Sequence, residues 1–406
     1  MSVFREIPPT AGLPIYLKDL LHLFNPKTHE SSLEDDFMEY LNVDYAKVTY
    51  SGTAALYLIL EALKEVSFKK TVIMPSYICP LVPLAVKRAG LVAQVCDINN
   101  DDFNFNLNKL RELCSRNNDI LAIIPAHLAG IPVDFDSIEG MVRGYKIFTI
   151  EDCAQSLGAT YKGKKVGRLG DFSFFSLCRG KGLTIYEGGA VVVNKKEYIP
   201  ILDKKIRELV RDDFVSEGIK LLELFGYWVF YRPSLFWFVY KLPQLFWNLK
   251  GRELKVLMED FTMDFPIHKV SGVRKLVGHV SFHHLTEEIK KQRQKADYYI
   301  RGLKDIKGIK VVKEMPGSWA TYPYLTVLFD DLNRRNNALK FFKNLGLGIS
   351  IVYARAINDY DYLKDIMPYS DSTNGRALAE KQLTLSTSAF LTQKEQNLIL
   401  EIIRSC

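Results

Sequence analysis

The chain has 406 residues, 48% of them hydrophobic, and carries 54 Lys and Arg against 47 Asp and Glu, a formal net charge of +7. This length exceeds the size at which a single hydrophobic core usually stops growing, so we expect a large domain and a smaller one. The excess of positive charge is mild and forms no dense basic stripe. This argues against nucleic acid as a partner and favours a small anionic substrate.

The six cysteines show neither Cys-x-x-Cys spacing nor a disulfide framework, which indicates a reducing, cytoplasmic location. The N-terminal residues lack the apolar stretch of a signal peptide. No later stretch has the roughly 18 uncharged apolar residues of a membrane span. We therefore expect a soluble or peripheral protein.

Short β-rich runs alternate with helix-compatible segments in the N-terminal half. This alternation predicts an α/β protein whose mostly parallel central sheet is covered by helices. Ligands of such sheets bind where the strands end, so loops near Ser51, Pro75, Pro125, Glu151 and Lys181 should converge on one crevice. The expected strands are 47–50, 72–74, 92–96, 121–124, 147–150, 172–176 and 190–193.

The C-terminal part has the pattern of a smaller α+β domain, entered through a long connecting helix. We place the boundary so that residues 1–265 form an N-terminal arm and the large domain, and residues 266–406 form the connecting helix and the small domain. The expected elements are a helix at 285–304, a strand at 322–329 and helices near 334–344 and 392–404.

Residues 221–249 form an unusually aromatic segment, with eleven aromatic residues between Phe225 and Trp247. Pro233, Pro243 and two basic residues interrupt it, so it cannot be one transmembrane helix. Three interpretations remain: a pair of short helices buried against the core or a subunit partner, a segment lying in a membrane interface, or a lid over a pocket.

Lys181 lies between a short apolar strand and a Glu-Gly-Gly turn, downstream of the acidic pair Glu151-Asp152. Pyridoxal phosphate chemistry needs a lysine for the aldehyde, an anion for the ring nitrogen, a phosphate cradle and a ring contact. Lys181 offers the amine and also a general acid and base, and Asp152 offers the anion. The structural alternatives are that Lys181 is an ordinary surface lysine and that Asp152 is the N-cap of a helix.

Candidates for the phosphate and ring contacts follow the same strands. The segment SGTA (51–54) joins a strand to a helix, so its N–H groups and the Thr53 hydroxyl are suited to a phosphate, although such helix starts are common. Ser176 is a second phosphate candidate. Gln155 is a candidate for the ring's oxygen or its face. The sequence therefore predicts a pyridoxal phosphate site.

Together these residues resemble the DegT/StrS family of pyridoxal phosphate-dependent sugar aminotransferases, which have the fold of the aspartate aminotransferases, fold type I. The resemblance covers most of the chain. It implies that Lys181 binds the cofactor covalently, Asp152 pairs with the ring nitrogen and Gln155 contacts the ring, while the phosphate is held by Gly52, Thr53, Ala54 and Ser176. The similar segments are SGTAAL (51–56), PAHLAGIPVDFDSI (125–138), IEDCAQSLGATYKGKKVGRLGDFSFFSL (150–177) and KGLTIYEGG (181–189).

The resemblance also implies a function. Members transfer an amino group from glutamate or glutamine to a keto-sugar, usually nucleotide-linked, for cell-surface polysaccharide or other glycan biosynthesis. They typically work as homodimers with shared active sites. Two alternatives stay open. One is a sugar dehydratase, although related dehydratases replace the lysine with histidine and this chain keeps Lys181. The other is a non-catalytic, membrane-associated regulator of the same fold.

Several positions depart from the family pattern. Cys79 falls near the place of the usual ring-stacking aromatic residue, and Tyr77 is a substitute two residues earlier. The asparagine that a partner subunit usually lends to the phosphate is absent, with His268 or Lys269 as substitutes. His127 either contacts the substrate or orders its loop. The histidines at 279, 283 and 284 have no partners at metal spacing, so we expect no metal site.

Overall fold

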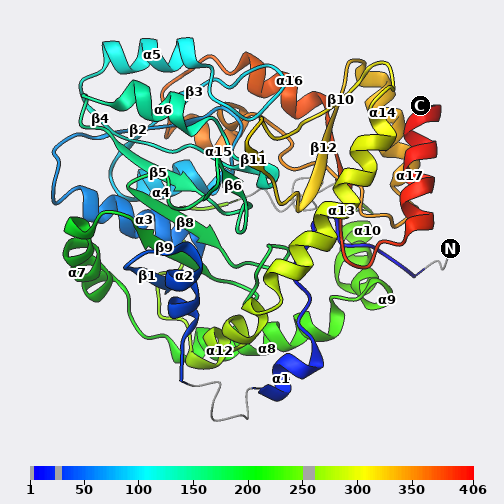
Figure 1. Ribbon diagram of the computed structural model, residues 1–406, viewed down its shortest axis with the longest axis horizontal. Coiled ribbons are helices and arrows are strands. Elements are labelled where there is room, and N and C mark those ends of the chain that lie inside the picture. Colours follow the sequence, from blue (N-terminus) through cyan, green and yellow to red (C-terminus); the bar gives the residue numbers. More distant parts are fainter. Residues whose placement is uncertain (1–3, 23–29, 250–260) are drawn as a thin grey trace.

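The computed structural model describes residues 4–22, 30–249 and 261–406 (Figure 1). Its centre is a seven-stranded sheet, and all seven predicted strands are present within two residues of their expected ends. These strands are β1 (Ala46–Thr49), β2 (Thr71–Pro75), β3 (Val92–Cys96), β4 (Ile120–Ile123), β5 (Phe148–Asp152), β8 (Phe172–Ser176) and β9 (Gly189–Val193). The order is β1-β9-β8-β5-β4-β2-β3, and only β9 runs antiparallel to its neighbours. The predicted mostly parallel α/β sheet is confirmed.

Helices cover both faces of this sheet, which explains why its strands read as continuous apolar runs. In β2, Ile73 packs into the cluster beneath α5 and α6, whereas its neighbours Val72 and Met74 pack into the core beneath α3 and α4. Figure 1 shows α5 and α6 on the opposite side of the sheet from α3 and α7. The covering helices are α2 (Leu33–Leu41), α3 (Gly52–Leu63), α4 (Leu81–Arg88), α5 (Leu107–Arg116), α6 (Phe135–Val142) and α7 (Ile199–Leu209).

The C-terminal part builds a second, antiparallel sheet in the order β10-β12-β13. The predicted connecting helix, strand and two further helices all occur, whereas the boundary at residues 265 and 266 stays a prediction. The elements are α12 (Gly272–Phe282), α13 (Leu285–Leu303), β10 (Ile309–Val311), β12 (Tyr324–Phe329), α14 (Leu332–Phe342), α15 (Asp361–Lys364), α16 (Thr373–Lys381), β13 (Gln382–Ser386) and α17 (Gln393–Ser405). A small third sheet joins β6 (Thr160–Tyr161), β7 (Lys164–Lys165) and β11 (Ser318–Trp319).

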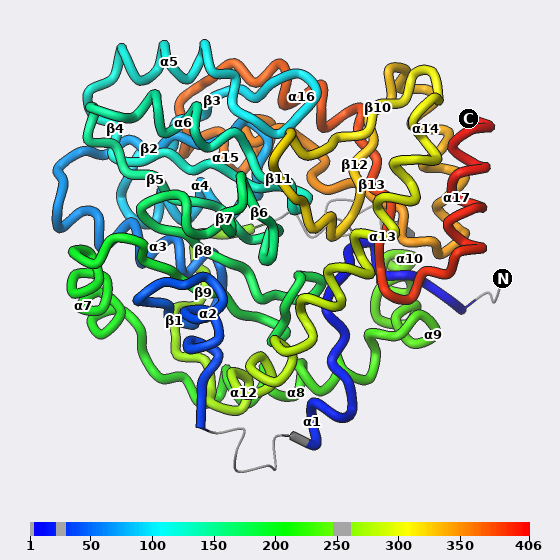
Figure 2. Tube along the Cα trace, viewed as in Figure 1, coloured from blue at the N-terminus to red at the C-terminus, as the bar shows by residue number. Residues whose placement is uncertain are grey.

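The N-terminal arm runs from near α17 along the centre of the molecule to α1 (Leu17–His22), as the blue trace in Figure 2 shows. The Ile7 N–H donates to the Gly346 carbonyl over 2.8 Å, and the Leu13 N–H donates to the Lys181 carbonyl over 3.2 Å. The arm therefore ties the C-terminal part to the loop that carries Lys181.

The aromatic segment is helical on both sides of a break at Tyr231 and Arg232, in line with the interpretation as two helices. It comprises α8 (Phe214–Phe230), α9 (Pro233–Phe236), a π-helical turn (Trp237–Lys241) and α10 (Leu242–Leu249). Pro233 begins α9, where its missing N–H costs nothing. The inner side of α8 packs through Leu224 and Tyr227 onto Ile15 and Val277. Among the described residues, no helix is both long and apolar enough to cross a membrane.

Candidate active site

A cavity of about 360 Å³ opens where β5 and β8 end and α3 begins. This is the edge at which the sequence predicts the crevice, because parallel strands gather their following loops there. The predicted site residues that line it are Gly52, Thr53, Cys79, His127, Asp152, Gln155, Ser176 and Lys181.

Lys181 is presented by the loop between β8 and β9. Gly180 precedes it with φ +76°, a conformation that favours glycine, and a Cβ at Gly180 would lie 2.6 Å from Thr10 Oγ1. The arm therefore packs directly against this loop. The hydrogen bond from the Leu13 N–H to the Lys181 carbonyl fixes the backbone further, so the position of the amine depends on a segment about 170 residues away in sequence.

Asp152 ends β5 with its carboxyl buried, 4% exposed, in the same cavity. Its Oδ1 accepts the Ala154 N–H over 2.9 Å, so the turn-capping role and the site role coexist. Burial raises the pKa of this carboxyl, and the Ala154 N–H, the Lys181 ammonium and His127 counteract that rise. A protonated ring nitrogen beside Asp152 would supply the missing positive charge, so this residue fits the predicted cofactor.

The start of α3 is set against the end of β8. A Cβ on Gly52 would lie 3.2 Å from the Phe175 carbonyl oxygen, so glycine allows the approach that brings Thr53 and Ser176 to one cavity. The first N–H groups of a helix lack partners inside it and suit an anion. Ala54 departs from the prediction: its N–H donates to Ser51 Oγ over 3.0 Å and it does not line the cavity.

Of the two ring-contact candidates, the structure brings only Cys79 to the cavity. Tyr77 is buried elsewhere: its hydroxyl donates to the Tyr353 carbonyl over 3.1 Å and accepts the Tyr353 N–H over 3.0 Å. The predicted contact of Tyr77 with the cofactor is therefore not supported. Burial raises the pKa of the Cys79 thiol to about 11, which keeps it neutral.

Gln155 is oriented by a tyrosine pair that sequence reasoning missed. Its Oε1 accepts the Ala129 N–H over 2.9 Å and the Tyr324 hydroxyl, and its Nε2 donates to the Tyr353 hydroxyl over 3.2 Å. A second cavity of about 200 Å³ lies beside the first and shares Lys181, Gln155 and Tyr353 with it. Lys181 thus borders two neighbouring cavities.

His127 orders its loop, one of its two predicted roles, and also lines the cavity. Its Nδ1 accepts the Val133 N–H over 3.2 Å, so Nε2 carries the proton and donates to Glu151 over 3.1 Å. Glu151 also accepts three backbone N–H groups of the turn at 167–170. His127, Glu151 and Cys153 are close enough to hold a metal, but these hydrogen bonds already occupy the carboxylate.

His268 and Lys269 lie outside the Lys181 cavity. They border a separate cavity of about 600 Å³, where the His268 ring packs on Tyr50 with ring centroids 4.1 Å apart. Lys269 Nζ pairs with Asp212 over 2.9 Å. Neither residue reaches the predicted phosphate site of its own chain, and their proposed service to a partner subunit stays a prediction.

Comparison with known proteins agrees with this geometry. The family model described as the DegT/DnrJ/EryC1/StrS aminotransferase family matches residues 23–219 and 268–404. An uncharacterized protein of Methanocaldococcus jannaschii is 26% identical over 91% of this chain and 87% of its own length. A UDP-4-amino-4,6-dideoxy-N-acetyl-beta-L-altrosamine transaminase of Campylobacter jejuni is 37% identical over 45% of this chain and 48% of its own length, so that match spans about half of the relative.

Solved structures share the fold over the whole chain. A putative sugar aminotransferase of Streptococcus pneumoniae, solved in its PLP form, superposes with a TM-score of 0.74 over 98% of both chains at 20% identity. The chain belongs to the DegT/DnrJ/EryC1/StrS aminotransferase family. The predicted family, fold type, aminotransferase class and pyridoxal phosphate cofactor are confirmed. Residues 220–267, which contain the whole aromatic segment 221–249, fall outside the family match.

Proposed function

We propose that the protein is a pyridoxal phosphate-dependent aminotransferase that moves an amino group from an amino acid, glutamate or glutamine, to a nucleotide-linked keto-sugar for glycan biosynthesis. The observation that carries this proposal is the placement of Lys181 and Asp152 on one cavity that also contains the start of α3. The Campylobacter relative, a transaminase of a UDP-linked amino sugar, supports a nucleotide-linked sugar as the acceptor.

Each residue of the cavity has a task in this reaction. When bound, the cofactor supplies an electron sink for the reacting carbon. Lys181 Nζ would accept the proton from the α-carbon of the donor and deliver it to the cofactor carbon, and would carry a proton in the opposite direction when the keto-sugar reacts. The Asp152 carboxylate would hold a proton on the ring nitrogen, and Thr53 and Ser176 would hold the phosphate with the start of α3, while Gln155 keeps one orientation through its tyrosine partners.

Absorbance spectroscopy tests the proposal. The purified protein reconstituted with pyridoxal phosphate should show a visible band that borohydride removes and that Lys181→Ala lacks. Glutamate or glutamine should bleach this band, and the true keto-sugar nucleotide should restore it. A band that no amino acid bleaches would contradict transamination, and water loss from the sugar without donor consumption would identify the dehydratase alternative.

A homodimer with shared sites is part of the proposal, with His268 and Lys269 serving the phosphate of the partner subunit. Both residues border a surface cavity away from their own Lys181, which is the arrangement such sharing needs. Mixing Lys181→Ala subunits with His268→Ala/Lys269→Ala subunits should restore activity, because each mixed dimer regains one intact site. Mixtures no more active than the parent proteins would exclude the sharing.

We also propose that α8 to α10 contact a membrane at its surface. The exposed side of these helices carries large apolar side chains, among them Phe214 at 85%, Leu222 at 73% and Phe225 at 59% exposure. Such a face is unusual on a free soluble surface. Co-sedimentation with anionic liposomes should fall for Leu222→Ser/Phe225→Ser. Liposome binding by a protein that forms no cofactor band would instead favour the non-catalytic regulator.

A further inference from the structure

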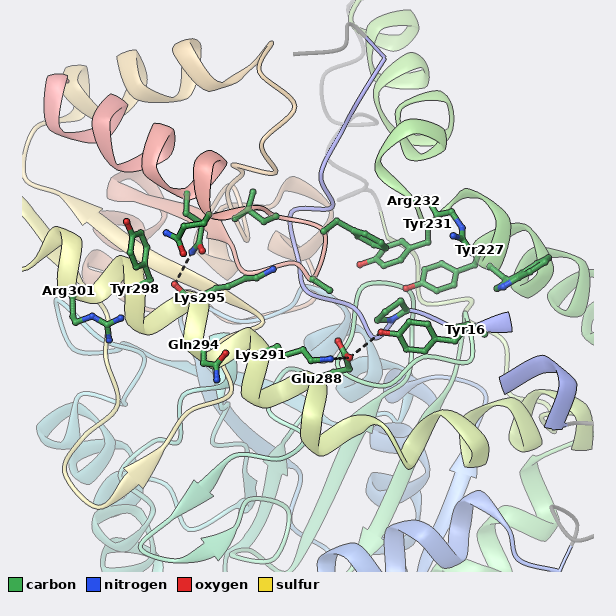
Figure 3. Close-up of a pocket in the computed structure, with 18 residues that line it drawn as sticks. Tyr16, Tyr227, Tyr231, Arg232, Glu288, Lys291, Gln294, Lys295, Tyr298 and Arg301 are labelled. Carbon is green, nitrogen blue, oxygen red and sulfur yellow. Dashed lines mark hydrogen bonds and ion pairs between the residues drawn. The ribbon is translucent and has the colours of Figure 1, made fainter. Parts of the chain in front are cut away.

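A groove of about 660 Å³ lies apart from the Lys181 cavity and shares no lining residue with it (Figure 3 shows the groove). One wall is α13 and the other is α8, with residues 14–16 of the arm between them. Thr10 of the same arm borders the small cavity beside Lys181, so the arm separates the two spaces. Most of the α8 wall belongs to residues 220–267, which the family model does not match.

The groove carries positive charge that the protein does not neutralise. Lys291, Lys295 and Arg301 come from α13, and Arg232 lies on the opposite wall at the start of α9 (Figure 3). The acidic member of the lining, Glu288, already pairs with Lys291 over 2.8 Å and accepts the Tyr16 hydroxyl over 3.1 Å. Within the described ranges, no carboxylate lies at ion-pair distance from the other three cations.

Lys295 is the cation whose surroundings most favour an added anion. Its ammonium is partly buried and donates to the Ser388 carbonyl. Burial lowers the pKa of this amine to about 8, while Glu288 and Glu395 oppose the shift and Lys291 adds to it. A ligand with negative charge beside Nζ would stabilise the charged form.

Aromatic side chains line the other end of the groove. Tyr227 and Tyr231 are buried and stack with their ring centroids 4.4 Å apart, and the half-buried Trp228 and Phe390 also line the space. A planar ligand group can pack against the exposed parts of the Trp228 and Phe390 rings.

We propose that this groove binds a nucleoside diphosphate, at a site separate from the catalytic cavity. The cations of α13 take the phosphates, since ammonium and guanidinium groups form their strongest hydrogen bonds with such oxygens. The aromatic end takes the base, because every base offers a π face and acceptor atoms. The volume lies in the range of small-molecule sites. A neutral glycan or an acyl chain would leave the three unpaired cations without partners.

Calorimetric titration of the full chain with UDP and with GDP tests this site. Lys295→Gln/Arg301→Gln should weaken the affinity for whichever of the two nucleotides binds by about tenfold or more, because it removes two cations that have no carboxylate partner. The control Lys290→Gln/Lys304→Gln changes the net charge equally at exposed positions of α13 and its C-cap, and should bind as the parent does. Trp228→Ala removes the indole ring from the groove and should also weaken binding.

Two results would overturn the proposal: neither nucleotide binds at millimolar concentration, or the control pair loses as much affinity as the groove pair. Inorganic diphosphate that binds as tightly as UDP or GDP would remove the role of the aromatic end. Nucleotide binding that Lys295→Gln/Arg301→Gln weakens and the control pair does not would support the groove even if the proposed transaminase activity failed.

Discussion

Arg274 of α12 forms a two-pronged ion pair with Glu217 of α8, with Nε 3.0 Å from Oε2 and Nη2 2.5 Å from Oε1. Arg274 is completely buried, and its Nη1 also donates to the carbonyl of Glu187, in the turn that follows the Lys181 loop. One guanidinium therefore joins the helix that leads into the aromatic segment to the chain that borders the active site.

Arg274→Leu should lower the free energy of unfolding by about 3–5 kcal/mol, because it leaves the Glu217 carboxylate buried without its partner. Urea denaturation measures the loss. The double variant Arg274→Leu/Glu217→Leu should recover a large part of it, since no unpaired charge remains. Equal losses for the single and the double variant would show that packing, and not the ion pair, holds these helices together.

Asp152→Asn should raise the thermal stability of the cofactor-free protein while it lowers transaminase activity by about a hundredfold or more. The carboxyl is buried and its pKa is raised, so the charged form destabilises the fold once the pH exceeds that pKa. Asparagine keeps an oxygen for the Ala154 N–H and removes the charge. Thermal melts should show the gain at pH 8 and a smaller gain at low pH; a variant that melts below the parent at both values would contradict this account.

Gly189→Ala should cost about 3 kcal/mol of stability and weaken cofactor binding. A Cβ at this position would lie 2.4 Å from the Ser51 carbonyl carbon, which is backbone and cannot yield without moving the start of α3. Gly182→Ala is the matched control, because nothing lies within 4 Å of the Cβ it would add. Chemical denaturation should leave Gly182→Ala within about 0.5 kcal/mol of the parent.

The sheet and most of the site follow from sequence because their causes are local. Strand-forming runs buried on both faces predict the seven strands, and loops that follow parallel strands must meet at one edge. Asp152 and Ser176 end their strands, whereas Thr53 and Lys181 follow strands, so all four meet at this edge of the sheet.

The residues that the sequence did not reveal reach the site through tertiary packing. Tyr353 and Tyr324 come from the C-terminal part and hold Gln155, yet neither lies in a motif. Tyr77 has a suitable position in sequence, but its hydroxyl is bound to the Tyr353 backbone. The direction of the Tyr77 side chain is set by a residue more than 270 positions away in sequence. A local sequence pattern carries no information about such a partner.

Glu6→Gln should make the protein more stable at pH 8 and leave it nearly unchanged at pH 5. Glu6 is buried beside the aromatic segment, where its N–H donates to the Pro233 carbonyl, and burial raises the pKa of its carboxyl to about 7 although Lys241 opposes the shift. The folded protein therefore holds this proton more tightly than the unfolded chain does. The stability that Glu6 contributes through its more tightly held proton is fully present below the unfolded pKa of 4.5. It is lost as the pH rises to the folded pKa of about 7.

This pKa difference corresponds to about 3 kcal/mol between the two ends of the titration. Urea unfolding of the parent and of Glu6→Gln between pH 5 and pH 8 should show that the difference between their free energies of unfolding grows as the pH rises. Glu380→Gln, at an exposed glutamate, is the control and should track the parent across the range. Parallel curves for Glu6→Gln and the parent would mean that Glu6 stays ionised in the folded protein, and that the arm is held against α9 without a protonated carboxyl.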